Sequence, residues 1–368
     1  MKIRENDFNI FDKSDVEIVS ESFDFSVFSG AKVLVTGATG TVGSLCVKSL
    51  ATNGVNVVAL IRNQDKANRI FQKELADKNI ASKIEFLVQD VRNQISTDLK
   101  IDYIIHCASE TASKAFVEHP VETILTTLDG TKNILEFAKN NNTKGVIFLS
   151  SIEVYGERHD TKETFTTEND LGFLNCLDLR SSYPEAKRMT ENLCVAYANQ
   201  FGVPVKIARL TQILSREFSK DDNRLIIQFA RAVKNKENII LHTKGETARN
   251  YCYVADAVSA ILTILTKGTN GEAYNVANPD DYYSVYELAK LLENEHTKVV
   301  LEIDGKNRGY AKTCQLHLDV SKLTSLGWGA RCPVYDEQGG GDIPLFLSIV
   351  QFFYERKPIH IGYRKLMR

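Results

Sequence analysis

The chain alternates between short runs rich in β-branched residues and longer segments in which apolar residues recur every three or four positions. Short apolar runs predict buried strands, and the recurring spacing predicts amphipathic helices between them. Six strands are expected, at Lys32–Thr36, Val55–Ile61, Ile84–Leu87, Tyr103–His106, Gly145–Ser150 and Val205–Arg209. This alternation is typical of an α/β protein with a parallel sheet covered by helices on both faces.

Two long helices are predicted between the later strands. In the first, which Pro120 opens, the apolar positions are Val121, Ile124, Leu125, Leu128, Ile134, Leu135 and Ala138. The second covers Tyr183–Phe201, with Ala186, Met189, Leu193, Ala196 and Tyr197 on one face. Beyond Arg209 the pattern is mixed, and it predicts helices near Asn223–Val233, Asp256–Leu265 and Ser284–Leu292 and a strand at Tyr251–Val254.

Both ends of the chain carry apolar residues outside this pattern. Before residue 31 these are Phe8, Ile10, Phe11, Phe23, Phe25 and Phe28, mixed with acidic residues, which predicts an extension packed on the outside of the fold. Near the other end, Phe346, Ile349, Phe352 and Phe353 follow the run Gly339–Gly341 and suggest a final packed helix.

Composition narrows the class of protein. Lys plus Arg (45) and Asp plus Glu (47) nearly cancel, and no basic block suits a phosphate backbone, so we expect no nucleic-acid partner. No apolar run approaches the roughly 20 residues of a membrane helix, and the N-terminus lacks the features of a signal peptide. The seven cysteines are scattered without a C-x-x-C pair, which favours reduced thiols. We therefore expect a soluble, cytoplasmic enzyme without membrane contact.

A glycine-rich loop follows the first strand, in the sequence Thr36-Gly37-Ala38-Thr39-Gly40-Thr41-Val42-Gly43. Glycines at a strand-to-helix turn let the backbone approach a pyrophosphate at the helix N-terminus, although a flexible turn is the alternative. The second strand ends at Arg62, where NAD-preferring sites usually carry an acidic residue. Arg62 could pair with a 2′-phosphate, which favours NADP over NAD, or could simply cap the strand. Asp90, after the third strand, could bind the adenine amino group or begin a loop.

Three motifs in order resemble the extended short-chain dehydrogenase/reductases, the NAD-dependent epimerase/dehydratase family. They are the glycine-rich loop, Ser150-Ser151-Ile152-Glu153-Val154-Tyr155-Gly156, and Tyr183-Pro184-Glu185-Ala186-Lys187. The segments Arg180–Arg188 and Gly245–Val254 look most like the UDP-glucuronate decarboxylase branch, followed by the nucleotide-sugar 4,6-dehydratases. The resemblance implies a nucleotide-sugar substrate, surface-polysaccharide biosynthesis and a homodimer built through the two long helices.

The expected architecture is a Rossmann-type doubly wound parallel sheet with a smaller C-terminal mixed α/β lobe. We interpret 1–30 as an N-terminal extension, 31–210 as the NAD(P)-binding domain, and 211–368 mainly as the substrate-binding lobe. Residues 250–278 are expected to return to the first domain. Within this arrangement the cofactor contacts implied are Thr36, Gly37, Thr39, Gly40, Thr41, Val42, Gly43, Arg62, Asp90, Val91, Cys107, Ala108, Ser109, Thr127, Tyr183 and Lys187.

Tyr183 and Lys187 lie one helical turn apart, on the same face of the predicted helix. The ammonium is expected to lower the pKa of the phenol and to bind the cofactor ribose, which makes Tyr183 a usable base. Ser151, at the end of a neighbouring strand, is expected to bond the sugar hydroxyl while hydride passes to the nicotinamide. Alone, such a pair is more often an amphipathic helix with a surface lysine.

Glu153 is the further catalytic candidate, because oxidation at sugar carbon 4 acidifies carbon 5. A carboxylate there could move the carbon-5 proton or assist loss of a carboxylate, and the alternative is a solvated charge at the strand end. Ile152 occupies a position that is polar in both related families and cannot donate a proton to a departing hydroxyl. Simple dehydration is therefore disfavoured, and the usual decarboxylase arrangement is altered.

The substrate-binding candidates are Arg180, Gln212 and Arg249. A guanidinium matches a diphosphate or a sugar carboxylate, and a structural ion pair is the alternative for both arginines. Two positions depart from the family pattern, because Thr127 and Gln212 stand where Asn is usual, and Ile213-Leu214-Ser215 replaces a glycine-proline turn. His106 is expected to shape the nicotinamide loop, and the histidines show no metal-ligand spacing, so no metal is predicted.

The leading hypothesis is an enzyme that transiently oxidises carbon 4 of a nucleotide-sugar with bound NAD(P) and then decarboxylates or epimerises it. An NADPH-dependent reductase of a keto-sugar nucleotide and a nucleotide-sugar 4,6-dehydratase remain alternatives. A different class is a catalytically silent dinucleotide-sensing module. The intact Ser151, Tyr183 and Lys187 favour the enzyme.

Overall fold

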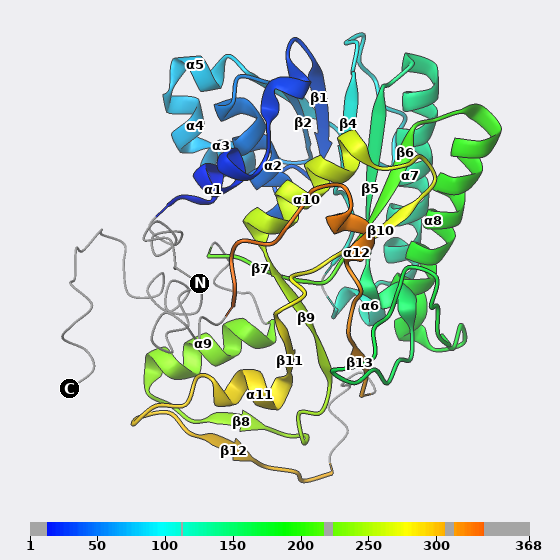
Figure 1. Ribbon diagram of the computed structural model, residues 1–368. Coiled ribbons are helices and arrows are strands. Elements are labelled where there is room, and N and C mark those ends of the chain that lie inside the picture. Colours follow the sequence, from blue (N-terminus) through cyan, green and yellow to red (C-terminus); the bar gives the residue numbers. More distant parts are fainter. Residues whose placement is uncertain (1–12, 112, 217–223, 306–312, 335–368) are drawn as a thin grey trace.

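The computed structural model describes residues 13–111, 113–216, 224–305 and 313–334 (Figure 1). Its main sheet has seven parallel strands in the order β10-β6-β5-β4-β1-β2-β3. Their bounds are β1 Lys32–Thr36, β2 Asn56–Ile61, β3 Ile84–Val88, β4 Tyr103–His106, β5 Gly145–Ser151, β6 Val205–Leu210 and β10 Ala273–Val276. The strand order reverses between β1 and β4, which is where open parallel sheets bind ligands.

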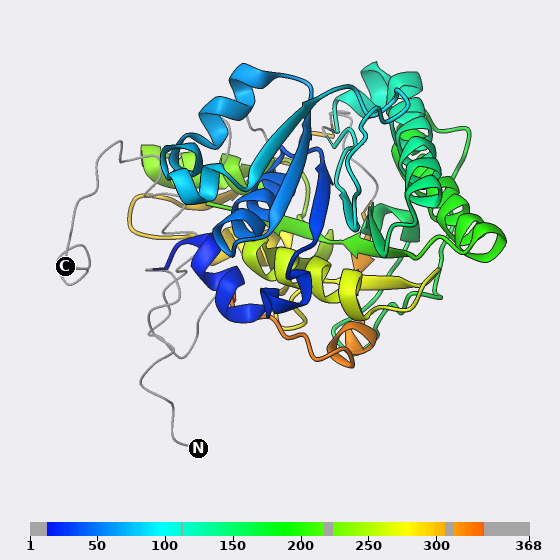
Figure 2. The same cartoon turned by 90° about the horizontal axis from the view of Figure 1, so that it is seen from above.

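Helices cover both faces of this sheet (Figure 2). On one face α1 (Asp15–Ser22), α2 (Thr41–Thr52) and α10 (Val254–Lys267) pack against one another, and on the other lie α7 (Pro120–Asn141) and α8 (Ser182–Phe201). Side chains along β1 alternate between them, since Val33 and Val35 join the first core and Leu34 joins the second. The expected doubly wound architecture is confirmed.

Shorter helices complete this part of the molecule. They are η2 (Phe25–Phe28), α3 (Gln64–Ile70), α4 (Gln72–Ala76), α5 (Lys78–Ala81), α6 (Ala115–Glu118), η3 (Ile152–Tyr155), η4 (Leu179–Ser181) and α12 (Ser321–Thr324). No helix within the described ranges combines the length and the apolar composition needed to cross a bilayer.

A smaller lobe lies below the carboxyl ends of the strands (Figure 1). Its centre is β9 (Ala248–Tyr253), which pairs with β7 (Gln212–Leu214), β11 (Tyr282–Ser284) and β13 (Gln315–Leu316). A separate parallel pair, β8 (Ile239–Leu241) and β12 (Val299–Leu301), lies beside α9 (Leu225–Asn235) and α11 (Val285–Lys290). After β9, α10 packs on α2, and β10 joins the edge of the large sheet.

The six predicted strands are confirmed within one residue at each end, but the seventh, β10, was not predicted. β10 contains the polar Asn275, which is fully buried. Its burial is possible because its side chain accepts a hydrogen bond from the Tyr155 hydroxyl at 2.5 Å. The extension also lies deeper than expected, since Ile18 and Val19 of α1 are fully buried. Phe8, Ile10 and Phe11 and the proposed C-terminal helix lie outside the described residues.

The faces of α7 differ from the predicted ones in its first half. Thr123, Thr127 and Thr131 point inward, whereas Val121 and Leu125 are 61% and 45% exposed. Threonine hydroxyls can be buried here because each donates to the carbonyl four residues earlier, so the first turns pack through methyl groups. An apolar stripe of α7 is consequently left on the surface.

Two buried carboxylates hold the last described segment in place. Asp256 on α10 accepts the backbone N–H groups of Arg331 and Cys332, and Asp281 accepts that of Val334 at 2.9 Å. Burial raises the pKa of Asp256 to about 6 and that of Asp281 to about 7, against the opposing effect of these N–H groups. Keeping these groups charged therefore costs stability near neutral pH.

Replacing Asp281 by Asn should remove a pH dependence of stability. Because the folded-state pKa is raised, the native carboxyl keeps its proton between about pH 4 and 7 while the unfolded one loses it, so stability falls as pH rises through that window. The wild type should lose roughly 3 kcal/mol of unfolding free energy there relative to Asp281→Asn. Urea titrations at a series of pH values measure this, with Asp98→Asn, an exposed carboxylate, as the control. Parallel pH profiles for wild type and Asp281→Asn would contradict the assignment.

Candidate active site

The loops at the carboxyl ends of the strands surround a cleft of about 850 Å³. The cleft runs from the ends of β2 and β3 to the end of β6 and to β7 of the smaller lobe. It crosses the point between β1 and β4 where the strand order reverses. The predicted residues that line it are Gly37, Thr39, Gly40, Thr41, Val42, Gly43, Arg62, Asp90, Val91, Cys107, Ala108, Ser109, Ser151, Glu153, Tyr183, Lys187 and Gln212. Segments up to 175 residues apart in the chain thus meet in one place.

The glycine-rich loop fits a dinucleotide. Gly37 has a φ of +62°, and a Cβ there would lie 2.8 Å from the Ala108 nitrogen, so only glycine allows the approach of the β4 loop. A Cβ on Gly43 would lie 2.4 Å from the Gly37 carbonyl oxygen. Gly40 caps α2 without a side chain, so no side-chain cap competes with an anion for the amides of the first turn. These residues can hold a pyrophosphate.

Charged residues surround the end of the cleft beside β2 and β3. Asp90 accepts two hydrogen bonds from the Arg92 guanidinium, at 3.1 and 3.0 Å, and one from the Arg92 backbone. The bonds from Arg92 lower the pKa of Asp90, and the charge of Arg62 adds to this. Lys66 lines the same end, together with Arg62 and Arg92. Sequence reasoning missed Lys66 and Arg92.

A buried hydrogen-bond network supports the cleft floor. Thr36 is fully buried, its hydroxyl lies 2.7 Å from His106 Nδ1, and it accepts the Ala108 N–H at 3.1 Å. His106 Nε2 lies 3.0 Å from the Thr131 hydroxyl, and burial lowers the pKa of the imidazole to about 3, so the ring is neutral. Thr127 is also buried and lies beneath Ser109. Thr36 and Thr127 therefore lie below the cleft instead of lining it.

Lys187 is 2% exposed and lies over the Phe148 ring, 4.6 Å from its centroid. Its ammonium donates to the Leu149 carbonyl at 2.7 Å. Burial lowers the pKa of this amine to about 7, although the Glu191 carboxylate one turn further along α8 opposes the shift. The amine is thus held in place by the strand that ends at Ser151. Near neutral pH its charged and neutral forms are both populated.

The expected lowering of the Tyr183 pKa by Lys187 is not found. Burial raises the pKa of this phenol, and a hydrogen bond with Ser151 is what opposes the rise. The phenol ring stacks on Phe116, with centroids 4.2 Å apart and planes within 6°. Lys187 is turned toward the strand carbonyl. The hydrogen bond with Ser151 is thus the interaction that lowers the pKa of Tyr183 against burial. Sequence reasoning missed Phe116.

Glu153 and Arg180 form an ion pair at the edge of the site. Arg180 Nη1 donates to Glu153 at 2.8 Å, and Nη2 lies 3.4 Å from the other carboxylate oxygen. The guanidinium also lies 5.7 Å from the Phe116 ring centroid. Both charged side chains are partly exposed, at 29% for Arg180 and 24% for Glu153. Of the roles considered for Arg180, the structure shows the ion pair, and its partner is the catalytic candidate.

A second, buried ion pair holds α8 against the sheet. Arg209 at the end of β6 donates to both carboxylate oxygens of Glu191, at 2.7 and 3.0 Å, and to the Tyr155 hydroxyl at 3.0 Å. The Tyr155 hydroxyl in turn donates to Asn275 of β10. This network fixes the helix that carries Tyr183 and Lys187 relative to the strand that carries Ser151.

The remaining substrate candidates separate in space. Gln212 lines the cleft, as does Arg224 at the start of α9, which sequence reasoning missed. Arg249 lies on β9, outside the lining residues, in register with Tyr283 and Leu316. Among the described residues, no three His, Cys, Asp or Glu side chains are placed to hold a metal ion.

Comparison with known proteins adds to this geometry. A family model, described as the NAD dependent epimerase/dehydratase family, matches residues 33–277. The chain belongs to this family. Within the NAD dependent epimerase/dehydratase family it is 29% identical over 301 residues to UDP-glucuronic acid decarboxylase 6 of Arabidopsis thaliana, covering 82% of this chain and 84% of that one.

A second relative and a solved structure are also similar to this chain. UDP-N-acetyl-alpha-D-glucosaminuronate decarboxylase of Bacillus cytotoxicus is 30% identical over 274 residues, covering 73% of this chain and 82% of that one. The crystal structure of dTDP-glucose 4,6-dehydratase from Bacillus anthracis in complex with NAD superposes with a TM-score of 0.70 at 18% identity. The match covers 89% of this chain and 97% of that one. The family resemblance expected from the sequence motifs is confirmed.

Proposed function

We propose that this protein binds a UDP-hexuronate beside NAD(P) and decarboxylates it after transient oxidation at sugar carbon 4. The observation that carries the proposal is the convergence of Ser151, Glu153, Tyr183 and Lys187 next to a glycine-rich loop shaped for a dinucleotide. Two relatives named as decarboxylases of UDP-sugar acids support the choice of substrate class.

The chemistry follows from the positions of the side chains. A bound nicotinamide would supply a hydride acceptor for the oxidation at carbon 4 and a hydride donor for the final reduction. Tyr183 takes the proton of the carbon-4 hydroxyl, and Ser151, hydrogen-bonded to Tyr183, orients that hydroxyl. Lys187, whose ammonium bonds the Leu149 carbonyl beside this pair, is available to the cofactor ribose. Ser151 and the Tyr183 phenolate thus handle the proton of the carbon-4 hydroxyl.

Glu153 acts at carbon 5. A ketone at carbon 4 lies β to the carboxylate on carbon 5, so that carboxylate leaves as carbon dioxide and the bond electrons form an enolate. In this proposal Glu153 controls protonation of the enolate at carbon 5, which is supported by the hydrogen bond from Arg180 that orients its carboxylate. Dehydration has less support, because Ile152 is 5% exposed and offers no proton donor.

Purified protein should release carbon dioxide from UDP-glucuronate or its 2-acetamido counterpart in heavy water and place one deuterium at carbon 5, as read by product mass. Glu153→Gln should lower this turnover about 100-fold, because a general acid–base group is lost. Glu163→Gln, an exposed carboxylate in the following loop, serves as the control. Deuterium uptake without loss of carbon dioxide would replace decarboxylation by epimerisation, and an unaffected Glu153→Gln would remove its role.

We further propose a preference for NADP over NAD. Arg62, Lys66 and Arg92 line the adenosine end of the cleft, and the carboxylate of Asp90 is already paired with Arg92. A 2′-phosphate would meet an excess of positive charge there.

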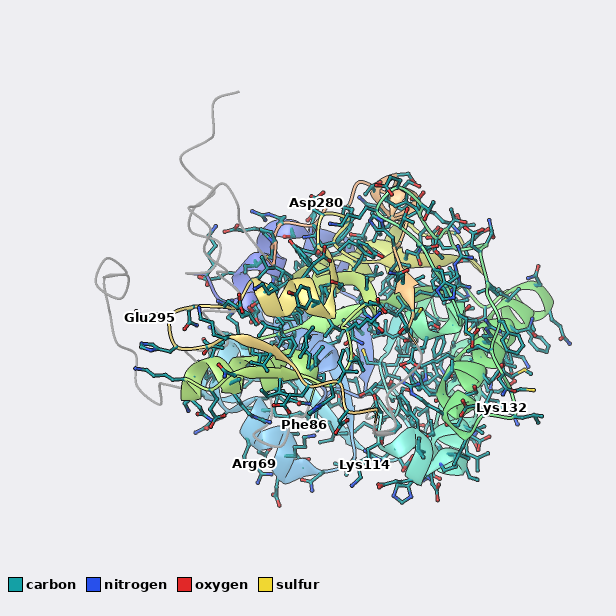
Figure 3. All side chains as sticks on the ribbon, turned by 90° about the horizontal axis from the view of Figure 1, so that it is seen from below. Arg69, Phe86, Lys114, Lys132, Asp280 and Glu295 are labelled. Carbon is teal, nitrogen blue, oxygen red and sulfur yellow. The ribbon has the colours of Figure 1, made fainter. Side chains whose placement is uncertain are left out.

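Arg62→Ala should weaken NADP binding about tenfold and change NAD binding by less than about twofold, because only the 2′-phosphate contact is lost. Isothermal titration with both dinucleotides measures this. Arg69→Ala, on α3 at the periphery in Figure 3, is the matched control. Equal losses for the two dinucleotides, or no loss, would contradict a contact between Arg62 and the 2′-phosphate.

A homodimer through α7 and α8 is also proposed. Val121, Leu125 and Met189 are exposed on these helices, and a groove between them is lined by Ile124, Leu128 and Met189.

We also propose a cytoplasmic location. All seven cysteines are free thiols, as is usual in a reducing compartment.

Light scattering on the eluting protein should give twice the chain mass for the wild type. Met189→Glu should shift the mass to that of one chain, because a charge would be buried in the interface, whereas Met189→Leu should leave it unchanged. A wild type that elutes as a single chain would contradict the dimer.

A further inference from the structure

The N-terminal helix α1 is tied to the strand that forms one wall of the cleft. Its first residue, Asp15, accepts a hydrogen bond from Arg216 Nε at 3.1 Å and another from the Tyr253 hydroxyl at 2.5 Å. A second guanidinium nitrogen of Arg216 also bonds Asp15 and donates to the Lys13 carbonyl at 2.8 Å. Three segments, more than 200 residues apart at the extremes, therefore meet at one carboxylate.

This junction is largely removed from solvent. The side chains of Arg216 and Asp15 are 19% and 16% exposed, and Tyr253 is fully buried with its ring 5.7 Å from the guanidinium. Charged hydrogen bonds in such surroundings are costly to leave unmade. Asp15 is itself held by the packing of α1 and by a capping box between Ser14 and Glu17. The carboxylate is thus a fixed point.

The fixed point is connected to the cleft through strand register. In the parallel pair β7–β9, Leu214 lies opposite Tyr253 and Gln212 lies opposite Tyr251. The Ile213 carbonyl accepts a hydrogen bond from Arg224 Nη1 at 3.1 Å. Gln212 and Arg224 line the cleft, on the side of the sheet away from β2 and β3. Tyr253 lies on β9, the partner strand of β7, and Arg216 lies two residues after the end of β7. By bonding both residues, Asp15 restrains β7 through its partner strand and through the segment that follows it.

We propose that Asp15 is a positioning residue for nucleotide-sugar binding, acting through Arg216 and Tyr253 on the wall that carries Gln212 and Arg224. The inference rests on the proposed function for the identity of the ligand, and on the structure alone for the constraint on β7. The dinucleotide end of the cleft is formed by the loops after β1, β2 and β3, and among the described residues Asp15, Arg216 and Tyr253 do not line the cleft. Loss of Asp15 should therefore affect one ligand and spare the other.

The test compares Asp15→Asn and Asp15→Ala with Lys13→Ala in the full-length protein. Lys13→Ala removes an exposed ion pair with Glu21 from the same helix and leaves the junction intact. Titration with UDP should show affinity about tenfold lower for Asp15→Ala, with a smaller loss for the isosteric Asp15→Asn, while dinucleotide affinity changes by less than about twofold. Hydrogen exchange of peptides that cover 211–216 should be about tenfold faster in both Asp15 variants.

The two readouts separate the inference from the function on which it rests. If wild-type protein fails to bind UDP, the proposed substrate class is wrong, and faster exchange in 211–216 still supports the constraint on β7. Unchanged exchange there in both Asp15 variants would overturn the inference. Equal loss of UDP and dinucleotide affinity would also overturn it, because that pattern reflects general destabilisation.

Discussion

All seven strands of the large sheet run in the same direction, so every strand ends at one edge. The site depends on this constraint, because residues from the ends of β1, β2, β3, β4, β5 and β6 can meet only there. Gly37 lets two of these loops approach within van der Waals contact. The position of the cleft is thus a consequence of topology, and its chemistry is set by the side chains at the strand ends.

The chemistry depends on how charge is buried at that edge. Lys187 has a pKa near 7 because it is removed from solvent, and the buried pair Glu191–Arg209 holds its helix against the sheet. Glu153 is kept in position by Arg180, which also covers the Phe116 ring stacked on Tyr183. Each candidate catalytic group is therefore oriented by a neighbour. Buried ion pairs are expensive in free energy, and this one joins α8, which carries Tyr183 and Lys187, to β6, the strand next to the one that carries Ser151.

Local signals predicted much of the fold. The strands, the glycine-rich loop and the Tyr183–Lys187 spacing follow from patterns a few residues long, and the structure places these residues as expected. Features that join distant positions were not predictable in this way. The pairing of Glu153 with Arg180, the stacking of Phe116 on Tyr183 and the junction at Asp15 need the folded chain, and the polar β10 lacks a strand pattern. The pKa of Tyr183 was mispredicted because burial raises it and the ammonium of Lys187 bonds the Leu149 carbonyl instead of the phenol.

In the proposed reaction the dinucleotide acts catalytically and is regenerated in each cycle. The most direct test is to strip the purified protein of dinucleotide, add it back at one equivalent, and follow product formation from UDP-glucuronate together with absorbance at 340 nm. The stripped protein should form no product, the reconstituted protein should complete many turnovers, and the absorbance should show no net change. Product formation without dinucleotide, or consumption of one reduced dinucleotide per product, would contradict a catalytic role of the dinucleotide.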